Sequence, residues 1–319
     1  MPSCCNHAET GLLTQSDLQP TIKRPDTMAD IRQISGIAEV IDRYDGFILD
    51  LWGVLHDGER PYPGVPDCLD RMRAAGKTLC LLSNAPRRTR GVIEKLDGMG
   101  LGRECYHHVM TSGEATYEAL RDRDDPWHAA LGRRLYHIGP ERDIDVFDGL
   151  GYQVAATPAE ADFVVNTGIV TFGETLADYQ PQLDACLAAG LPMICANPDL
   201  VVMVGPMLVI CAGTLAARYE EMGGDVRQHG KPYAPVYERC FKLLGIADKS
   251  RILAVGDSLR TDVAGANAAG IDVALVTAGI HQEELGGAAW GEADDPVNLR
   301  ALADASGHMP TYAMPSLRW

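Results

Sequence analysis

The chain has 319 residues, which is enough to bury a large core and to form two domains. Its hydrophobic content of 46% and charged content of 23% are ordinary for a globular protein, but 44 acidic residues against 28 basic ones give a net charge of −16. This charge repels nucleic acid phosphates and anionic membrane surfaces, so we expect neither nucleic acid nor a membrane as a partner.

The cysteine pattern indicates the cellular compartment of the protein. Nine cysteines are spread through the chain without a C-x-x-C pair, which is typical of reduced thiols in the cytosol. The first residues also lack the apolar segment of a signal peptide. We therefore expect a cytoplasmic protein.

The first part of the chain predicts an alternation of strands and helices. Residues 1–32 are polar and irregular, and we expect a poorly ordered N-terminal extension there. The pattern then predicts a strand from Ile37 to Leu49, a helix over 66–75, a strand over 78–82 and a helix over 87–99. Such βαβ units predict a parallel sheet that is covered by helices on both faces.

A second alternating series follows between residues 113 and 226. It predicts strands at 135–138, 163–165 and 193–195 and a helix over 176–189. The uncharged run 200–217 is long enough to span a membrane, but Gly205-Pro206 interrupts it. We interpret this run as an extended segment followed by a buried helix that begins near Cys211. The whole series is expected to form a separate α/β domain.

The first domain resumes after this insertion. Its predicted extent is therefore 33–112 together with 227–319, with the inserted domain at 113–226. The second part predicts a helix over 233–244, strands that begin at Ile252 and Val273, and a tail from Gly286 to Trp319.

Polar side chains follow three of the predicted strands. Asp50 comes directly after Phe47-Ile48-Leu49, Ser83-Asn84 follow the strand over 78–82, and Asp257 follows the strand that begins at Ile252. The carboxyl ends of parallel strands meet at one edge of a sheet, where ligands bind in this class of fold. Taken alone, Asp50 fits the role of a helix cap better than that of a site residue. Three strands with polar ends favour a common site.

Four segments of the chain resemble, in order, the motifs of the haloacid-dehalogenase-like (HAD) hydrolase superfamily. They are Asp50-Leu51-Trp52-Gly53-Val54-Leu55, Ser83-Asn84, His229-Gly230-Lys231-Pro232 and Gly256-Asp257 with Asp262. Thr111-Ser112-Gly113, Asn197-Pro198-Asp199 and Gly230-Lys231-Pro232 are similar to segments of subclass IIA, the p-nitrophenylphosphatase and pyridoxal-phosphatase-like group. The resemblance spans about 37–280. It implies a Rossmann-like core with a parallel sheet, and an inserted α/β cap domain of the C2 type.

The resemblance also implies roles for individual residues. Asp50 would be the nucleophile that takes a phosphoryl group from an ester as an aspartyl-phosphate, which water then hydrolyses. A phosphate dianion is repelled by a carboxylate, so a cation is required, and oxygen ligands suit Mg²⁺. The implied ligands are Asp50, Asp257, the Trp52 backbone carbonyl and Asp262, the last directly or through water. The implied phosphate-binding residues are Ser83, Asn84 through its backbone N–H, Gly53 and Lys231, and Lys231 is also counted as catalytic.

One position departs from the pattern of this superfamily. Most similar phosphatases carry a second Asp two positions after the nucleophile, as the general acid, and here that position is Trp52. An indole ring cannot transfer the required proton, and general acid catalysis is worth ~10²–10⁴ in rate. His56 and Asp57 lie close by in the sequence, although both also suit the turn at Asp57-Gly58. We expect slow hydrolysis of unactivated alkyl phosphates.

Three functions remain open at this point. The favoured one is a Mg²⁺-dependent hydrolase of a small phosphorylated metabolite. An aromatic residue at position 52 is also found in true haloacid dehalogenases, although those need no metal and this chain keeps Asp257 and Asp262. The third is a phosphometabolite-binding protein with little turnover. Substrate choice would depend on cap residues, and the candidates, which equally suit turns, are Thr167, Gly168, Asn197 and Asp199. The edge of the cap is the surface on which a homodimer would form.

Overall fold

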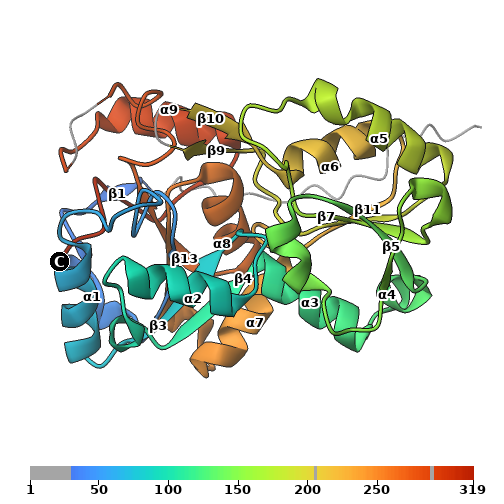
Figure 1. Cartoon of the computed structure of the whole chain (residues 1–319). Helices are drawn as coiled ribbons and strands as arrows, with labels where there is room; N and C mark the ends of the chain where they lie inside the picture. The colour runs from blue at the N-terminus through green and yellow to red at the C-terminus, as the bar shows by residue number, and fades with distance from the viewer. Residues whose placement is uncertain (1–29, 205–206, 288–290) are drawn as a thin grey trace, which may run out of the picture. The chain divides into compact units, whose positions relative to one another are not determined.

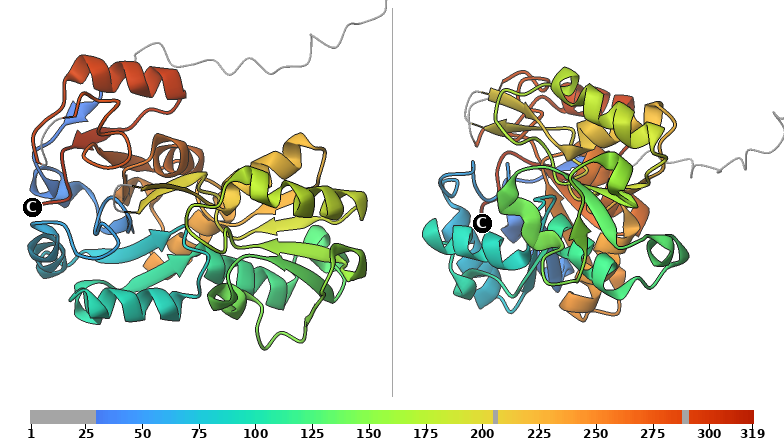
Figure 2. Two further views of the ribbon diagram at one scale, coloured as in Figure 1. Left: turned by 45° about the horizontal axis from the view of Figure 1, so that its top comes forward. Right: turned by 45° about the vertical axis from the view of Figure 1, so that its right-hand side comes forward.

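The computed structural model describes residues 30–204, 207–287 and 291–319 (Figure 1). Its larger sheet has seven strands in the order β1-β14-β13-β12-β2-β3-β4, and every neighbouring pair is parallel. The strands are β1 (Arg32–Gln33), β2 (Gly46–Asp50), β3 (Thr78–Ser83), β4 (His108–Thr111), β12 (Ile252–Gly256), β13 (Asp272–Val276) and β14 (Tyr312–Met314). Figure 2 shows the blue and red segments adjoining, as the pairing of β1 with β14 requires.

Helices pack against both faces of this sheet. Successive side chains of a strand point to opposite faces. Phe47 and Leu49 of β2 accordingly belong to a core with α1 (Val65–Ala74) and α2 (Thr89–Gly98). Ile48 belongs to the core on the other face, which is formed with α7 (Ala234–Leu244), α8 (Ala264–Ala269) and α9 (Pro296–Ser306). Because both faces are covered, the central strands are continuous apolar runs.

A second, smaller sheet is formed by residues from the middle of the chain. Its five strands are parallel, in the order β11-β8-β7-β5-β6. They are β5 (Arg134–Ile138), β6 (Gln153–Val154), β7 (Phe163–Asn166), β8 (Met193–Cys195) and β11 (Val226–Gln228). One face packs against α5 (Leu176–Ala188) and α6 (Ala212–Glu221), and the other against α3 (Ser112–Asp122) and α4 (Pro126–Ala130). The predicted α/β core with an inserted α/β cap is confirmed.

The uncharged run 200–217 forms a hairpin and the start of a helix. Strands β9 (Val201–Val204) and β10 (Met207–Ile210) pair antiparallel, and α6 begins at Ala212. Gly205-Pro206, the predicted interruption, lies outside the described residues. Within the described ranges, no helix has the length and apolar character that crossing a bilayer requires.

Several predicted boundaries differ from the structure. The strand predicted from Ile37 begins only at Gly46, because residues 37–39 and 41–43 form 3₁₀ turns. The predicted tail contains α9 and β14, and β14 joins the larger sheet. The boundary predicted between residues 226 and 227 falls inside β11, so the chain leaves the smaller sheet after Gln228. The predicted extension lies outside the described residues up to residue 29, and Arg32 at its end belongs to β1.

Candidate active site

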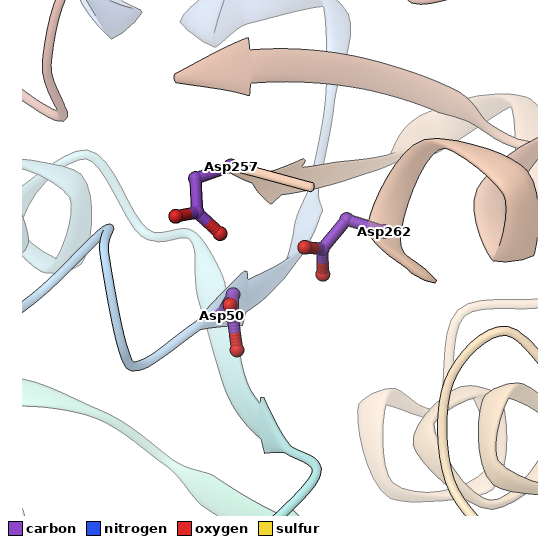
Figure 3. Close-up of side chains that lie close together, drawn as sticks. All are labelled: Asp50, Asp257 and Asp262. Atoms are coloured by element: carbon purple, nitrogen blue, oxygen red, sulfur yellow. The ribbon is translucent and has the colours of Figure 1, made fainter. Parts of the chain in front are cut away.

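Two neighbouring strands of the larger sheet, β2 and β12, place three carboxylates at one edge. Asp50 is the last residue of β2, Asp257 follows β12, and Asp262 lies in the helical turn Leu259–Val263 that begins just beyond it. Carboxylate oxygens of these three residues all lie within 4.8 Å of one another. Figure 3 shows the three side chains close together. All three side chains are buried.

Lys231 is the counter-charge of this cluster. Its Nζ lies 2.6 Å from Asp50 Oδ1 and 2.7 Å from Asp262 Oδ1, and the residue is only 3% exposed. Burial lowers the pKa of Lys231, but Asp262 and Asp50 outweigh this effect, so the pKa lies well above its usual value. Lys231 therefore carries its charge in the folded protein.

One lysine leaves the carboxylate cluster short of positive charge. Burial raises the pKa of Asp257 to about 7, and the charge of Asp262 adds to the effect. Three convergent carboxylates are hard oxygen ligands of the kind that bind a divalent cation through few protein groups and several waters. The residues of this site therefore fit a metal ion of this type, which would also lower the pKa of Asp257.

The turn after β2 approaches the cluster closely. Gly53 has φ +82°, and a Cβ atom at this position would lie 2.0 Å from Asp257 Oδ2. Asp257 is held in place because its Oδ2 accepts a 3.0 Å hydrogen bond from the Ile280 N–H. The turn that contains the Trp52 carbonyl and the Gly53 N–H thus lies against a carboxylate of the cluster.

Asn84 connects four parts of the site through its side chain. Its Oδ1 accepts hydrogen bonds from the Lys231 N–H at 2.8 Å and from Ser112 Oγ at 3.1 Å. Its Nδ2 donates to Asp199 Oδ1 at 2.9 Å and to the Lys231 carbonyl at 3.1 Å. Reasoning from the sequence gave Asn84 a role only through its backbone. The structure adds that its side chain fixes the Lys231 loop and contacts Asp199 of the cap.

Trp52 packs beside the cluster together with His56. Their ring centroids are 5.7 Å apart, and the Lys95 ammonium lies 5.0 Å from the centroid of the indole ring. His56 is buried, its Nδ1 accepts the Gly58 N–H at 3.0 Å, and burial lowers its pKa to about 4. It is therefore neutral at pH 7 and cannot supply an imidazolium proton. The exposed Asp57 carboxylate accepts hydrogen bonds from the N–H groups of Glu59 and Arg60. Asp57 thus has the role in the turn that the sequence allowed as the alternative to proton transfer.

A cavity of about 230 Å³ adjoins this site. Ser83, Trp52 and His56 of the core line it, and the four cap candidates Thr167, Gly168, Asn197 and Asp199 all line it as well. Reasoning from the sequence missed several other lining groups, among them three cationic side chains, one carboxylate and the apolar side of the hairpin. These residues are Arg87, Lys95, Arg142, Asp143, Val202, Val204, Val209 and Ile210. No local motif marks them, since the fold alone brings them together.

The family models and the most similar known proteins all indicate the same family. The family model described as haloacid dehalogenase-like hydrolase matches residues 47–153, and a HAD-hydrolase-like model matches 228–305. Human chronophin is 27% identical over 268 residues, which cover 81% of this chain and 90% of chronophin. Glycerol-3-phosphate phosphatase of Gallus gallus is 28% identical over 300 residues, which cover 87% of this chain and 91% of that protein.

Solved structures agree with the sequence matches. A hydrolase of the haloacid dehalogenase-like family from Brucella suis 1330 is 35% identical with a TM-score of 0.74, over 88% of this chain and 98% of that one. The 4-nitrophenylphosphatase of Thermotoga maritima shares the fold, with a TM-score of 0.66 at 24% identity over 87% of this chain and 96% of that one. The family and the enzymatic nature predicted from the sequence are thereby confirmed. This chain belongs to the haloacid dehalogenase-like hydrolases, among the phosphatases of subclass IIA.

Proposed function

We propose that this protein is a Mg²⁺-dependent phosphatase that hydrolyses a small phosphomonoester through an aspartyl-phosphate on Asp50. One observation carries the proposal: Asp50 lies 2.6 Å from the Lys231 ammonium, in a cluster with Asp257 and Asp262 beside a cavity of small-molecule size. A carboxylate nucleophile with an ammonium and metal-binding carboxylates around it suits phosphoryl transfer.

The chemistry assigned to Asp50 has two steps. Its carboxylate oxygen attacks phosphorus while the bond to the ester oxygen breaks, and that oxygen leaves as an alkoxide or aryloxide with both electrons of the bond and then takes a proton from solvent water. Water then attacks the phosphoryl group on Asp50 and releases inorganic phosphate. Lys231 and Ser83 hold the phosphoryl oxygens, where negative charge accumulates.

Asp50, Asp257, Asp262 and the Trp52 carbonyl would hold the Mg²⁺ ion. When bound, the ion supplies positive charge that lets a phosphate dianion approach a carboxylate. Burial and the charge of Asp262 raise the pKa of Asp257, and a bound cation would favour the deprotonated carboxylate.

Trp52 shapes the expected substrate range. Neither the indole ring nor the neutral His56 protonates a departing alkoxide. We therefore expect this phosphatase to prefer esters whose leaving group needs no proton, such as aryl phosphates with a leaving-group pKa of about 10 or less.

The test is a steady-state assay with p-nitrophenyl phosphate, with Mg²⁺ and with a chelator. Asp50→Asn should lower the rate at least ~10³-fold in a folded protein, because it removes the nucleophile. Asp67→Asn is the matched control, since Asp67 is exposed on α1 and pairs with Arg71, and it should keep the rate. Full activity of Asp50→Asn would exclude the proposed nucleophile.

Two other measurements distinguish the remaining candidate functions. Metal-independent release of halide from a haloacid would identify a dehalogenase. Tight binding of a phosphorylated compound without turnover would identify a binding protein. Either result would replace the phosphatase proposal.

A further inference from the structure

Hydrolysis of an aspartyl-phosphate on Asp50 needs a proton acceptor. When water attacks the phosphoryl group, the water oxygen bonds to phosphorus and must lose a proton, and a positioned base typically contributes ~10²–10⁴ in rate. The residue two positions after Asp50 is Trp52, whose indole N–H donates but does not accept. The base for this step therefore has to come from another part of the site.

The groups that line the cavity include few proton acceptors. Besides the cations, its titratable side chains are those of His56, Asp143, Asp199 and Cys211. The Nδ1 atom of His56 accepts the Gly58 N–H, so the neutral ring carries its proton on Nε2, and its pKa of about 4 makes it a weak base. Burial raises the pKa of the Cys211 thiol to about 12, so this thiol is protonated at pH 7. The two carboxylates remain.

The two carboxylates differ in their partners. Burial raises the pKa of both, so their pKa values do not distinguish them. Asp143 faces two cations, since its Oδ1 lies 3.4 Å from Arg87 Nε and 3.9 Å from Arg142 Nε. Asp199 belongs to none of the ion pairs of the described residues. Its Oδ1 accepts a 2.9 Å hydrogen bond from Asn84 Nδ2, and no hydrogen bond found in the described part of the chain uses Oδ2. One oxygen of Asp199 is thus held in place, and the other is left for a molecule in the cavity.

Asp199 lies at the phosphate end of the cavity. Its partner Asn84 directly follows Ser83, which lines the cavity as well and is assigned to the phosphoryl oxygens. Asn84 also accepts the N–H of Lys231, whose ammonium lies 2.6 Å from Asp50. Water approaches phosphorus in line with the bond to Asp50, and therefore from the side away from the sheet edge, where the cap residues line the cavity. A cap carboxylate bonded to Asn84 borders this approach.

The surroundings of Asp199 suit a base. Burial raises its pKa above the usual value and Asp262 adds to the effect, whereas Lys231 and the Asn84 amide act to lower it. A carboxylate whose pKa lies nearer to neutral is a stronger proton acceptor. Lys231 and Asn84 stabilise the ionised form, which is the form that accepts. An ionised carboxylate has no proton to give to an alkoxide, so the expected preference for aryl esters is unchanged.

The inference rests on the proposed function and adds a catalytic residue to it. We propose that Asp199 is the general base for hydrolysis of the aspartyl-phosphate. Its Oδ2 takes one proton of the attacking water while the water oxygen bonds to phosphorus. The bond between phosphorus and the Asp50 oxygen breaks, with both electrons on that oxygen. Inorganic phosphate leaves, and Asp199 then returns the proton to solvent water in the cavity.

The test is stopped-flow hydrolysis of p-nitrophenyl phosphate with Mg²⁺ by Asp199→Asn. The amide keeps an oxygen that can accept from Asn84, but it is not a base, so only the second step should slow. We expect a burst of about one p-nitrophenolate per enzyme molecule, with a rate constant no lower than the wild-type kcat. The steady-state kcat after the burst should be ~10²-fold lower than that of the wild type, and mass spectrometry after an acid quench should find phosphorylated enzyme.

The matched control is Asp184→Asn. Asp184 is exposed on α5 of the cap, where it accepts from Gln180, and its variant should keep the wild-type kcat. An unchanged kcat in Asp199→Asn, in an enzyme whose wild type hydrolyses p-nitrophenyl phosphate, would overturn the assignment and leave the phosphatase intact. Absence of both burst and turnover in the wild type would overturn the proposed function itself.

Two further outcomes would assign Asp199 a different role. A burst that slows in proportion to kcat would overturn the assignment, because Asp199 would then act only by positioning Lys231 through Asn84. Asp143→Asn tests the rival carboxylate in the same assay. A retained burst with a lowered kcat in Asp143→Asn, and a wild-type kcat in Asp199→Asn, would identify Asp143 as the base instead.

Discussion

Replacement of Gly53 by alanine tests the geometry of the carboxylate cluster directly. The change has two costs. The φ of +82° lies in the left-handed region, where a residue with a Cβ costs roughly 1–2 kcal/mol. The new Cβ would also lie 2.0 Å from Asp257 Oδ2, so the carboxylate must move by at least about 1 Å to reach an ordinary contact. Asp257 is short and is held by the Ile280 N–H, so the movement changes the position of this proposed metal ligand.

The expected consequence is a loss of metal affinity and rate. Mg²⁺ demands near-ideal octahedral geometry, and a displacement of 1 Å in a catalytic group can cost about 10²-fold in rate. We expect Gly53→Ala to lower kcat/KM for p-nitrophenyl phosphate about 100-fold and to raise the Mg²⁺ concentration needed for half-maximal activity.

Gly76→Ala is the matched control. Gly76 has φ +75°, and no heavy atom lies within 4 Å of the place where its Cβ would be. Gly76→Ala should therefore lose about 1–2 kcal/mol in the free energy of unfolding, measured by denaturant titration, and Gly53→Ala at least as much, while only Gly53→Ala loses activity. Equal activity and equal Mg²⁺ dependence of the two variants would refute the placement of Asp257 as a metal ligand.

Two further predictions concern the missing acid and the metal. Trp52→Asp should raise kcat/KM on alkyl phosphates relative to aryl phosphates, by up to ~10²–10⁴, because it restores a proton donor two positions after the nucleophile. No gain in a folded variant would contradict this explanation. The pKa of Asp257 is raised from 3.8 to about 7, so the folded protein binds the proton more tightly than the unfolded chain, and the metal-free protein should lose stability as pH rises from about 4 through 7. Mg²⁺ binds the deprotonated carboxylates, so the rise in Tm on adding Mg²⁺ should be larger at pH 8 than at pH 6. An equal rise at both pH values would be evidence against Asp257 as a ligand.

The sequence predicted the central elements well because their environment leaves a clear pattern. Strands β2, β3 and β12 are buried on both faces, so they are continuous apolar runs that end in polar residues. The same property predicted that Asp50 and Asp257 lie at one edge of the sheet. Their roles as nucleophile and ligand remain predictions for the experiments above.

The edges of the sheet were less predictable. Strand β14 has only three residues, and it forms because β13 and β1 pair with it on either side. Ile37 and Ile41 are buried, as their hydrophobicity indicates, but they lie in 3₁₀ turns. Hydrophobicity therefore predicted burial there without predicting the backbone.

The cavity depends on long-range structure. Arg87 and Asp143 are far apart in the sequence, and no pattern within either segment relates one to the other. The sequence named four cap residues as candidates for substrate choice without separating that role from a role in turns, and the fold brings all four to one cavity. Motifs identify chemistry that a family shares, whereas selectivity depends on residues that only tertiary structure brings together.

The amide of Asn84 joins the reaction centre to the cap. Four hydrogen bonds on one short side chain connect the end of β3, both backbone polar groups of Lys231, Ser112 and Asp199. Asp199 belongs to the cap, while Lys231 anchors the ammonium against Asp50. A change in the position of the cap is therefore expected to change the orientation of the Lys231 backbone, because both depend on the same amide. A ligand that drew Asp199 inward would therefore pull on the same amide that holds the Lys231 backbone beside Asp50.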